Sequence, residues 1–536
     1  MNPPPNTDTE RRLPSGFAWQ LVALVLVIVG CKLWLVASFS SPLPFLDQWK
    51  GEGAEVLRPW MKGELRITDL VAPFNEHRIV PSRVLLLGLF EGNARQWDSQ
   101  VEMIAGALLH AACAVVLGAV LVRQLGRRFT VPVLGALLVL FCLPFDWQNT
   151  LWGFQTSFYF LILFSVIACW GLGGSAAGSK SWWMGAVAGL LACLSLGSGG
   201  LAGLAIAGWV GLKMIVHSGT RRASGSWATL GVSLALGALG SALYTPPKIA
   251  SIGALQARTP GSFLWGFAIH LGWPNSTSPF FALLAYAPFV VLVCLRLRAA
   301  RRNRAGEFSI EDFLFPLGFW VLLQAAAIAY SRNHPVASVI SRYMDLLALG
   351  ALVNFCCLLR LFQLSSASPP SIWARRALVP GAAVWTAVAL AGLVPLLQRN
   401  FRLDLPSLQK IHRVQIAAVR QFVTNGRGDD LGGKPVFGLP PADLDILADL
   451  LRDPVAQNIL PTGIGIRRIS AAPGPLTTAA RMLTDGWGLL LGAGVLTFVL
   501  SALSDWLASR RNLPKTPSRA DIGRIAVPDS SAKNAA

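Results

Sequence analysis

The chain has 536 residues, of which 53% are hydrophobic and only 14% are charged. A soluble protein has roughly a quarter of its residues charged, so this composition excludes an ordinary soluble protein and indicates an integral membrane protein. The net charge is +19. Because the basic residues cluster in short segments between apolar runs, the positive-inside rule explains them as cytoplasmic loops. We therefore expect no nucleic acid as a partner.

The eight cysteines all fall within apolar runs, so no disulfide framework is predicted. Residues 1–16 are polar and Pro-rich, and we predict a disordered cytoplasmic N-terminus. The apolar run Phe17–Phe39 is too long for the apolar region of a signal peptide and is predicted as a retained first span. A polar loop, residues 40–98, follows it and is predicted to face outside.

The rest of the membrane domain, which we place at residues 17–397, is predicted from further apolar runs. One long run, Trp182–Ile215, is broken by a Gly/Ser turn at residues 195–200 and is predicted to form two short spans. The segment Phe263–Trp273 falls short of the ~20 residues that a spanning helix needs, so spanning and lying at the interface both stay open. The remaining predicted spans are about Ser99–Val122, Val131–Pro144, Ser157–Leu172, Trp227–Tyr244, Phe280–Leu297, Phe313–Tyr330, Met344–Phe362 and Ala377–Leu397.

Residues 398–485 form a second large polar region, which we predict to be a small outer domain of mixed secondary structure. A last span is predicted at 486–508, and a disordered cytoplasmic tail at 509–536. The predicted fold is therefore an all-α integral membrane protein of about twelve transmembrane helices, with a helical first outer loop and both termini in the cytoplasm.

The first outer loop carries the most specific pattern. An acid, Asp47, follows the first span; then come a helix at 49–61, a turn at Gly63, an extended piece at 65–74, the charged run 76–78 and an amphipathic helix at 80–90. This order resembles the first outer loop of the GT-C glycosyltransferases, above all bacterial, uncharacterised members with an NEHR-type segment. These polytopic enzymes transfer a sugar from a polyprenyl-phosphate carrier.

The resemblance implies that Asp47 is the catalytic acid of the loop, acting as general base. It also implies a catalytic or metal-binding part for Asp146, at the mouth of the next outer loop. Gln48 stands where many relatives have a second acid, so the loop lacks that carboxylate pair. A divalent cation, Mg²⁺ or Mn²⁺, stays open as the cofactor, and no metal ligands are assigned.

The remaining candidates are groups that suit a sugar or a phosphate. Arginine makes bidentate contacts to phosphate, and aromatic faces stack on sugar rings. The competing interpretations are an interfacial belt of Trp and Tyr, a surface ion-pair cluster and a snorkelling arginine. We predict that donor phosphate is bound by His77, Arg78, Arg342 and Tyr343, and substrate by Trp49, Glu76, Trp147, Asn149, Trp152 and Gln155.

These features predict a glycosyltransferase that transfers hexosyl or pentosyl groups at the outer face of a bacterial cytoplasmic membrane. Its expected partners are a polyprenyl-phosphate sugar donor and a lipid, glycan or protein acceptor. A transporter or flippase of lipid-linked glycans is the main alternative. It would need ionisable groups inside the spans, whereas most acids here lie in loops and at span ends. An O-antigen-ligase-like enzyme is a further alternative.

Overall fold

The structure, a computed structural model, describes residues 16–216, 219–220, 223–246, 255–301, 310–332, 339–367, 372–425, 431, 438–461, 464 and 472–511. The described chain is helical, and its only β pairing is an isolated bridge between Phe74 and His77. Ten of the described helical stretches are long and apolar enough to cross a membrane. The prediction of a polytopic, all-α membrane protein is confirmed at this level.

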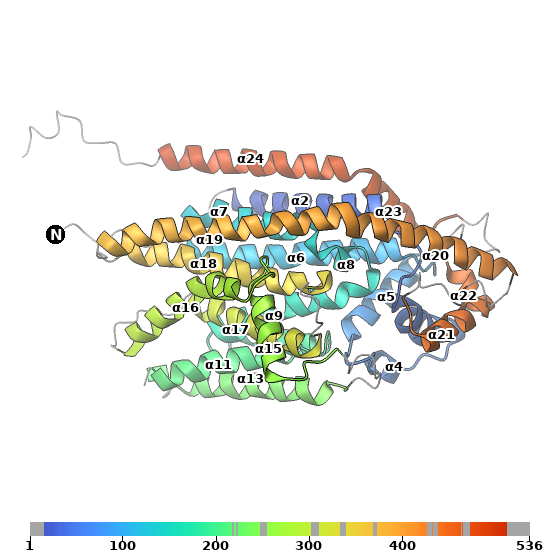
Figure 1. The fold of residues 1–536 in the computed structure, drawn as a ribbon, viewed down its shortest axis with the longest axis horizontal. Coiled ribbons are helices and arrows are strands. Elements are labelled where there is room, and N and C mark those ends of the chain that lie inside the picture. The colour runs from blue at the N-terminus through green and yellow to red at the C-terminus, as the bar shows by residue number, and fades with distance from the viewer. Residues whose placement is uncertain are drawn as a thin grey trace, which may run out of the picture.

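The membrane bundle consists of long helices that run along a common direction (Figure 1). They are α2 (Phe17–Phe39), α6 (Ser99–Leu125), α7 (Thr130–Cys142), α9 (Thr156–Gly174), α10 (Lys180–Cys193), α11 (Leu201–Val216), α13 (Ser224–Leu243), α16 (Phe280–Arg301), α17 (Glu311–Ser331), α18 (Met344–Ala367), α19 (Ile372–Arg399) and α24 (Trp487–Arg511).

Helix α7 is short by itself but belongs to a helical stretch of 24 residues, Arg127–Thr150, whereas α10 and α11 are short on their own. The Gly/Ser break at 195–200 divides the predicted long run into α10 and α11, of 14 and 16 residues. These two helices, added to the ten long stretches, would give twelve, and the count of twelve spans stays a prediction. The segment predicted as short and aromatic is α15 (Pro260–Leu271), which runs across the long helices in Figure 1.

The two ends of the bundle differ in charge. At one end Asp505 of α24 accepts hydrogen bonds from Gly16 and Gln20 of α2, and it lies 3.7 Å from Arg127 in the turn after α6. Basic residues also lie in the last turn of α16 (Arg298 and Arg301) and near the start of α19 (Arg375 and Arg376). From its basic residues, this end is expected to face the cytoplasm.

The opposite end carries a lobe of shorter helices, which we call the outer lobe because its segments are the ones predicted to face outside (Figure 1). Its elements are the π-helix η1 (Trp49–Leu57), α3 (Arg58–Lys62), α4 (Ile67–Val71), α5 (Val80–Gly92), η6 (Asn400–Asp404), α20 (Leu405–Asn425), α21 (Pro441–Arg452), α22 (Pro454–Ile459) and α23 (Pro475–Asp485). Helix α19 continues through η6 into α20, so one helical rod joins the membrane bundle to the lobe. In the described parts of 398–485 only helices occur, so the mixed structure predicted there is not seen in them.

The extended conformation predicted for residues 65–74 is wrong in its middle, where α4 forms one short helix. The reason is local: the Asp69 carboxylate accepts the Arg66 backbone N–H at 2.9 Å and closes a capping box.

The lobe has its own hydrophobic core, built jointly from the first outer loop and from residues beyond 405. Trp49, Trp97 and Phe422 are almost fully buried in it. Three ion pairs run along the same seam: Lys50–Asp443 at 3.1 Å, Arg58–Asp449 at 2.7 Å and Lys62–Asp453 at 2.7 Å. The two predicted outer segments therefore pack against each other and cover one end of the bundle.

Candidate functional site

A cavity of about 350 Å³ opens where the outer lobe meets the bundle. Its volume is within the range of small-molecule sites. The loop after α2 supplies Asp47, the segment before α5 supplies Glu76 and His77, and the ends of α17 and α18 supply further polar groups. The remaining polar and aromatic lining includes Gln155, Tyr244, Gln324, Arg332, Arg342 and Tyr343, and the apolar lining includes Phe154, Phe158, Leu201, Ile328 and Leu346.

The backbone is strained next to two of the lining acids. Leu46 has φ +48° directly before Asp47, and Asn75 has φ +51° directly before Glu76. Positive φ is uncommon for residues other than glycine and rarer still for leucine. Such strain costs about 1–3 kcal/mol per residue and persists where the surrounding structure enforces it, often at functional sites.

The Gly/Ser break between α10 and α11 receives the segment that carries Glu76 and His77. Val80 N–H donates to Leu194 O at 2.9 Å, and Gly197 N–H donates to His77 Nδ1 at 3.1 Å. A Cβ on Gly197 would lie 2.8 Å from the Glu76 carbonyl oxygen and 3.0 Å from His77 Nδ1. The close approach therefore requires a glycine at this position.

The contact with Gly197 fixes the tautomer of His77. Because Nδ1 accepts a hydrogen bond, neutral His77 carries its proton on Nε2. Burial lowers the pKa of His77 to about 4; Glu76 opposes this shift, and Arg332 and Arg342 add to it. At neutral pH His77 is therefore a neutral donor through Nε2–H.

Glu76 and Arg332 form an ion pair at 2.7 Å in the cavity wall. Burial by itself would raise the pKa of Glu76, but His77 and Arg332 outweigh burial and hold that pKa below its usual value. Glu76 is therefore a carboxylate whose charge Arg332 balances.

The pKa of Asp47 is shifted in the opposite direction to that of Glu76. Burial raises the pKa of Asp47; Arg342 and Lys50 oppose that rise, while Asp443 and Glu76 add to it. The Arg342 guanidinium lies 5.3 Å from the centre of the Tyr343 ring and has no carboxylate partner within the described residues. The cavity thus holds an acid of raised pKa together with an arginine available to an anion.

Two buried acids, Glu52 and Glu102, lie beside Gln48, the residue that follows Asp47. The Gln48 amide donates to Glu52 at 2.8 Å and to Glu102 at 3.3 Å, while its oxygen accepts the Phe45 N–H at 3.0 Å. Burial raises the pKa of Glu52 to about 7, against the hydrogen bond from Gln48. Gln48 thus points into the protein, where it is fully buried.

Of the twelve predicted site residues, six line this cavity: Asp47, Glu76, His77, Gln155, Arg342 and Tyr343. Arg78 does not line it; the Arg78 guanidinium donates to Val71 O at 2.8 Å and Leu243 O at 3.4 Å, which ties the lobe to α13. Arg332, which is not among those twelve residues, is in the cavity wall. Its signal in the sequence is a cationic residue at the outer end of an apolar run, a feature that many snorkelling residues share.

The three predicted tryptophans do not line the cavity. Trp49 is 2% exposed and packs edge-on against Trp97 in the core of the lobe. Trp152 is 4% exposed and packs edge-on against Phe45. Trp147 is partly buried against the cluster around Leu35. Their apolar area is used within the protein, which the sequence pattern alone does not distinguish from a sugar platform.

Asp146 and Asn149 belong to a buried polar network inside the bundle. Their segment, η3 (Pro144–Asp146) and α8 (Trp147–Thr150), turns inward at the end of α7. The ammonium of Lys32 on α2 lies 2.7 and 2.6 Å from the two Asp146 oxygens and 3.0 Å from Thr150 Oγ1. A lysine within an apolar span is the sequence signal that was missed, because such a charge needs a partner.

The network extends to α6 and α18. His110 Nε2 lies 3.7 Å from Asp345 Oδ1, and Asn149 Nδ2 donates to Asp345 Oδ2 at 2.8 Å and to Arg342 O at 2.9 Å. Asn149 therefore connects the interior network with the cavity wall. His110, Asp146 and Asp345 have ligand atoms within 4.8 Å of one another. Because Lys32 contacts both oxygens of Asp146, we assign no metal to this group.

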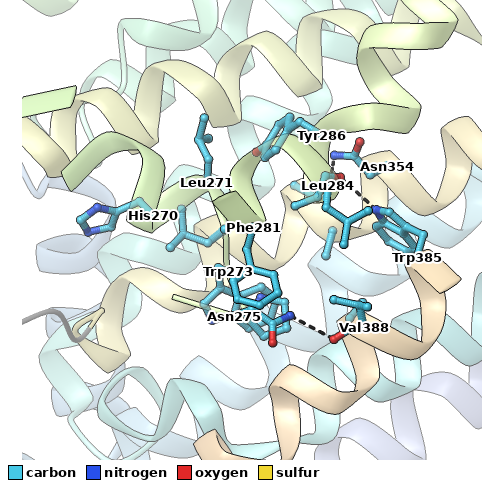
Figure 2. Close-up of a pocket in the computed structure, with 17 residues that line it drawn as sticks. His270, Leu271, Trp273, Asn275, Phe281, Leu284, Tyr286, Asn354, Trp385 and Val388 are labelled. Atoms are coloured by element: carbon cyan, nitrogen blue, oxygen red, sulfur yellow. Dashed lines mark hydrogen bonds between the residues drawn. The ribbon is translucent and has the colours of Figure 1, made fainter. Parts of the chain in front are cut away.

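Another cavity, of about 20 Å³, lies between α15, α16, α18 and α19 (Figure 2). Asn275 donates to Val388 O at 3.0 Å and Trp385 Nε1 donates to Ala285 O at 3.0 Å beside it. This volume suits a water molecule rather than a substrate. The larger cavity at the lobe is the candidate site.

Comparisons with protein-family models, with curated proteins and with solved structures find no match to this chain. The function is therefore argued from the geometry of the cavity and from the pattern of the first outer loop.

Proposed function

We propose that this protein is a membrane glycosyltransferase that moves a sugar from a polyprenyl-phosphate donor to a lipid, glycan or protein acceptor. The observation that supports this most is the cavity that joins Asp47 with Arg332 and Arg342 beside the membrane bundle. The proposal includes the GT-C type of fold, about twelve spans, and a site on the outer face of the bacterial cytoplasmic membrane.

In the proposed reaction Asp47 accepts the proton of an acceptor hydroxyl as that oxygen attacks the anomeric carbon of the donor. A base with a raised pKa keeps more proton affinity in the transition state. The bond from the anomeric carbon to the phosphate oxygen breaks, and the lipid phosphate leaves with its negative charge. Because attack and departure occur on opposite faces, the sugar would be transferred with inversion.

The leaving phosphate would be stabilised by hydrogen-bond donors of residues that line the cavity. Arg342 supplies a guanidinium that has no carboxylate partner in the described part of the chain, the neutral His77 supplies Nε2–H, and Tyr343 supplies a hydroxyl. Preorganised donors in a partly dry site are commonly the largest catalytic contribution of this kind. A divalent cation, if used, would supply further positive charge. Glu76 does not fit a metal-ligand role well, because Arg332 already pairs with it.

The test is sugar transfer by purified protein in lipid nanodiscs, using polyprenyl-phosphate-linked sugars as donors and membrane extract as acceptor. Asp47→Asn should abolish transfer. The matched control is Asp449→Asn, because Asp449 is a 70% exposed acid of the same lobe. Transfer that persists at the wild-type rate in Asp47→Asn would reject Asp47 as the base.

Transport of a lipid-linked glycan is a second candidate, which the buried network of Lys32, Asp146, His110 and Asp345 favours. Ionisable groups inside a bundle are typical of coupled transport. Translocation of a fluorescent lipid-linked sugar across vesicle membranes, without formation of a glycoside product, would support this candidate over the first.

A further inference from the structure

The buried network around Asp146 contains two carboxyl groups but only one lysine among the described residues. Lys32 and Asp146 form an ion pair of which each side chain is 1% exposed. Asp345 is the second carboxylate, and its residue is 4% exposed. Its side chain accepts a hydrogen bond from the neutral Asn149 amide at 2.8 Å, and the other carboxyl group, that of Asp146, lies close to it. A buried charge without a charged partner costs several kcal/mol.

His110 lies between the two acids and has unused hydrogen-bonding capacity. Its Nδ1 is 3.8 Å from Asp146 Oδ2 and its Nε2 is 3.7 Å from Asp345 Oδ1. The ring is 1% exposed, and Nδ1 is buried without a hydrogen-bond partner in the described structure. The centre of the His110 ring lies 4.4 Å from that of Tyr159, which stacks on it, and 4.5 Å from that of Phe141, so the ring is held in place.

We propose that Asp345 and His110 together bind one proton, and that this site inside the bundle is separate from the outer cavity. One proton on this pair balances the second carboxylate and leaves the four ionisable groups without net charge. The proton resides on Asp345, or moves to His110 when the ring approaches the carboxylate. The other groups that face the site are Lys32 on α2, Asp146 on η3, Tyr159 on α9 and Cys113 on α6.

A proton is favoured over a metal ion by the contacts of Asp146. Both of its oxygens lie within 2.7 Å of the Lys32 ammonium. A metal ion would have to displace this lysine, leaving two cations in one buried site. A proton on Asp345 or His110 requires no displacement of Lys32.

The site is linked to the cavity through one side chain. The Asn149 amide bonds Asp345 and the carbonyl of Arg342 at the same time. The proton therefore affects the segment that carries Arg342. This linkage does not depend on which reaction the cavity performs.

The test uses the dependence of reversible unfolding on pH, measured with the full chain in mixed detergent micelles. In the unfolded chain an aspartate titrates near pH 3.9 and a histidine near pH 6.5. If the folded pair always holds one proton, the folded chain binds one more proton than the unfolded chain above about pH 6.5. The unfolding equilibrium constant should then rise up to tenfold per pH unit above that pH.

Two variants sharpen the test. Asp345→Asn should remove this alkaline dependence, because neither state then holds the proton above about pH 6.5. His110→Gln should extend the dependence down to about pH 4, because the unfolded chain then lacks the histidine that binds a proton. The control is Asp312→Asn; Asp312 has its own lysine, Lys213, at 2.6 Å, so its loss should leave the wild-type alkaline dependence in place.

An equal alkaline dependence in the wild type and Asp345→Asn would overturn the proposal. So would stabilisation by added Mn²⁺ that appears in the wild type and is absent in Asp345→Asn, since that would identify a metal site. Should Asp345→Asn fail to fold, His110→Gln decides. An unfolding equilibrium constant that rises with pH from about pH 4 supports the proposal, and one that rises only above about pH 6.5, as in the wild type, overturns it.

Discussion

The Lys32–Asp146 pair should contribute strongly to folding, and replacing Lys32 by methionine tests this. The Lys32 ammonium contacts both Asp146 oxygens, at 2.7 and 2.6 Å, and Thr150 at 3.0 Å. Without it, the donors left to Asp146 among the described residues are the hydroxyls of Thr150 and Tyr159, each at 3.3 Å. Removing one partner of a buried ion pair costs about 3–5 kcal/mol. We therefore expect the unfolding equilibrium constant to rise by roughly 10²- to 10⁴-fold.

The double variant Lys32→Met/Asp146→Leu separates the pair from simple loss of volume. Replacing both charges by apolar groups is often near neutral, so the double variant should lose much less stability than Lys32→Met. The assay is reversible unfolding in mixed micelles, read as a double-mutant cycle. Lys50→Met, at a partly exposed pair with Asp443, is the control and should cost less than about 1 kcal/mol. Additive effects of the two buried replacements would refute the reasoning.

Three other outcomes follow from the structure. Burial raises the pKa of Asp47, so the transfer rate should fall with decreasing pH, and the fall should begin at a higher pH than the titration of an ordinary aspartate would give. A transfer rate that does not change with pH between acidic and neutral conditions would contradict this. Arg83, 1% exposed, donates to the Ala72 carbonyl at 2.6 Å and pairs with Glu55 at 2.9 Å; Arg83→Met should cost about 3 kcal/mol or more in urea unfolding. Asp449→Ala, at an exposed pair, should change stability by less than about 1 kcal/mol, and a larger loss would show that the seam is stronger than its exposure suggests.

The long apolar runs predicted most of the bundle, because hydropathy over about 20 residues determines membrane insertion. The predicted first span, Phe17–Phe39, coincides with α2, and the Gly/Ser break at 195–200 separates α10 from α11 as predicted. Helix ends were less predictable: α6 and α24 continue beyond the predicted spans into basic residues.

The site was predicted only in part, because proximity in the fold depends on tertiary packing. The charged run at 76–78 looks uniform in sequence, yet Glu76 and His77 line the cavity whereas Arg78 bonds two backbone carbonyls elsewhere. Asp146 appeared to lie at the mouth of a loop. The loop instead turns inward, because Lys32 supplies a cation within reach of this acid.

The most direct test of the account is binding of undecaprenyl phosphate to the purified protein, measured by native mass spectrometry. The account predicts that Arg342→Gln loses at least tenfold in affinity, while Asp47→Asn retains wild-type affinity. Arg399→Gln is the control, since Arg399 is a half-exposed arginine at the same end of the bundle, paired with Asp404 at 3.5 Å. Equal affinity of the wild type, Arg342→Gln and Arg399→Gln for this lipid would contradict the assignment of the cavity as a lipid-phosphate site.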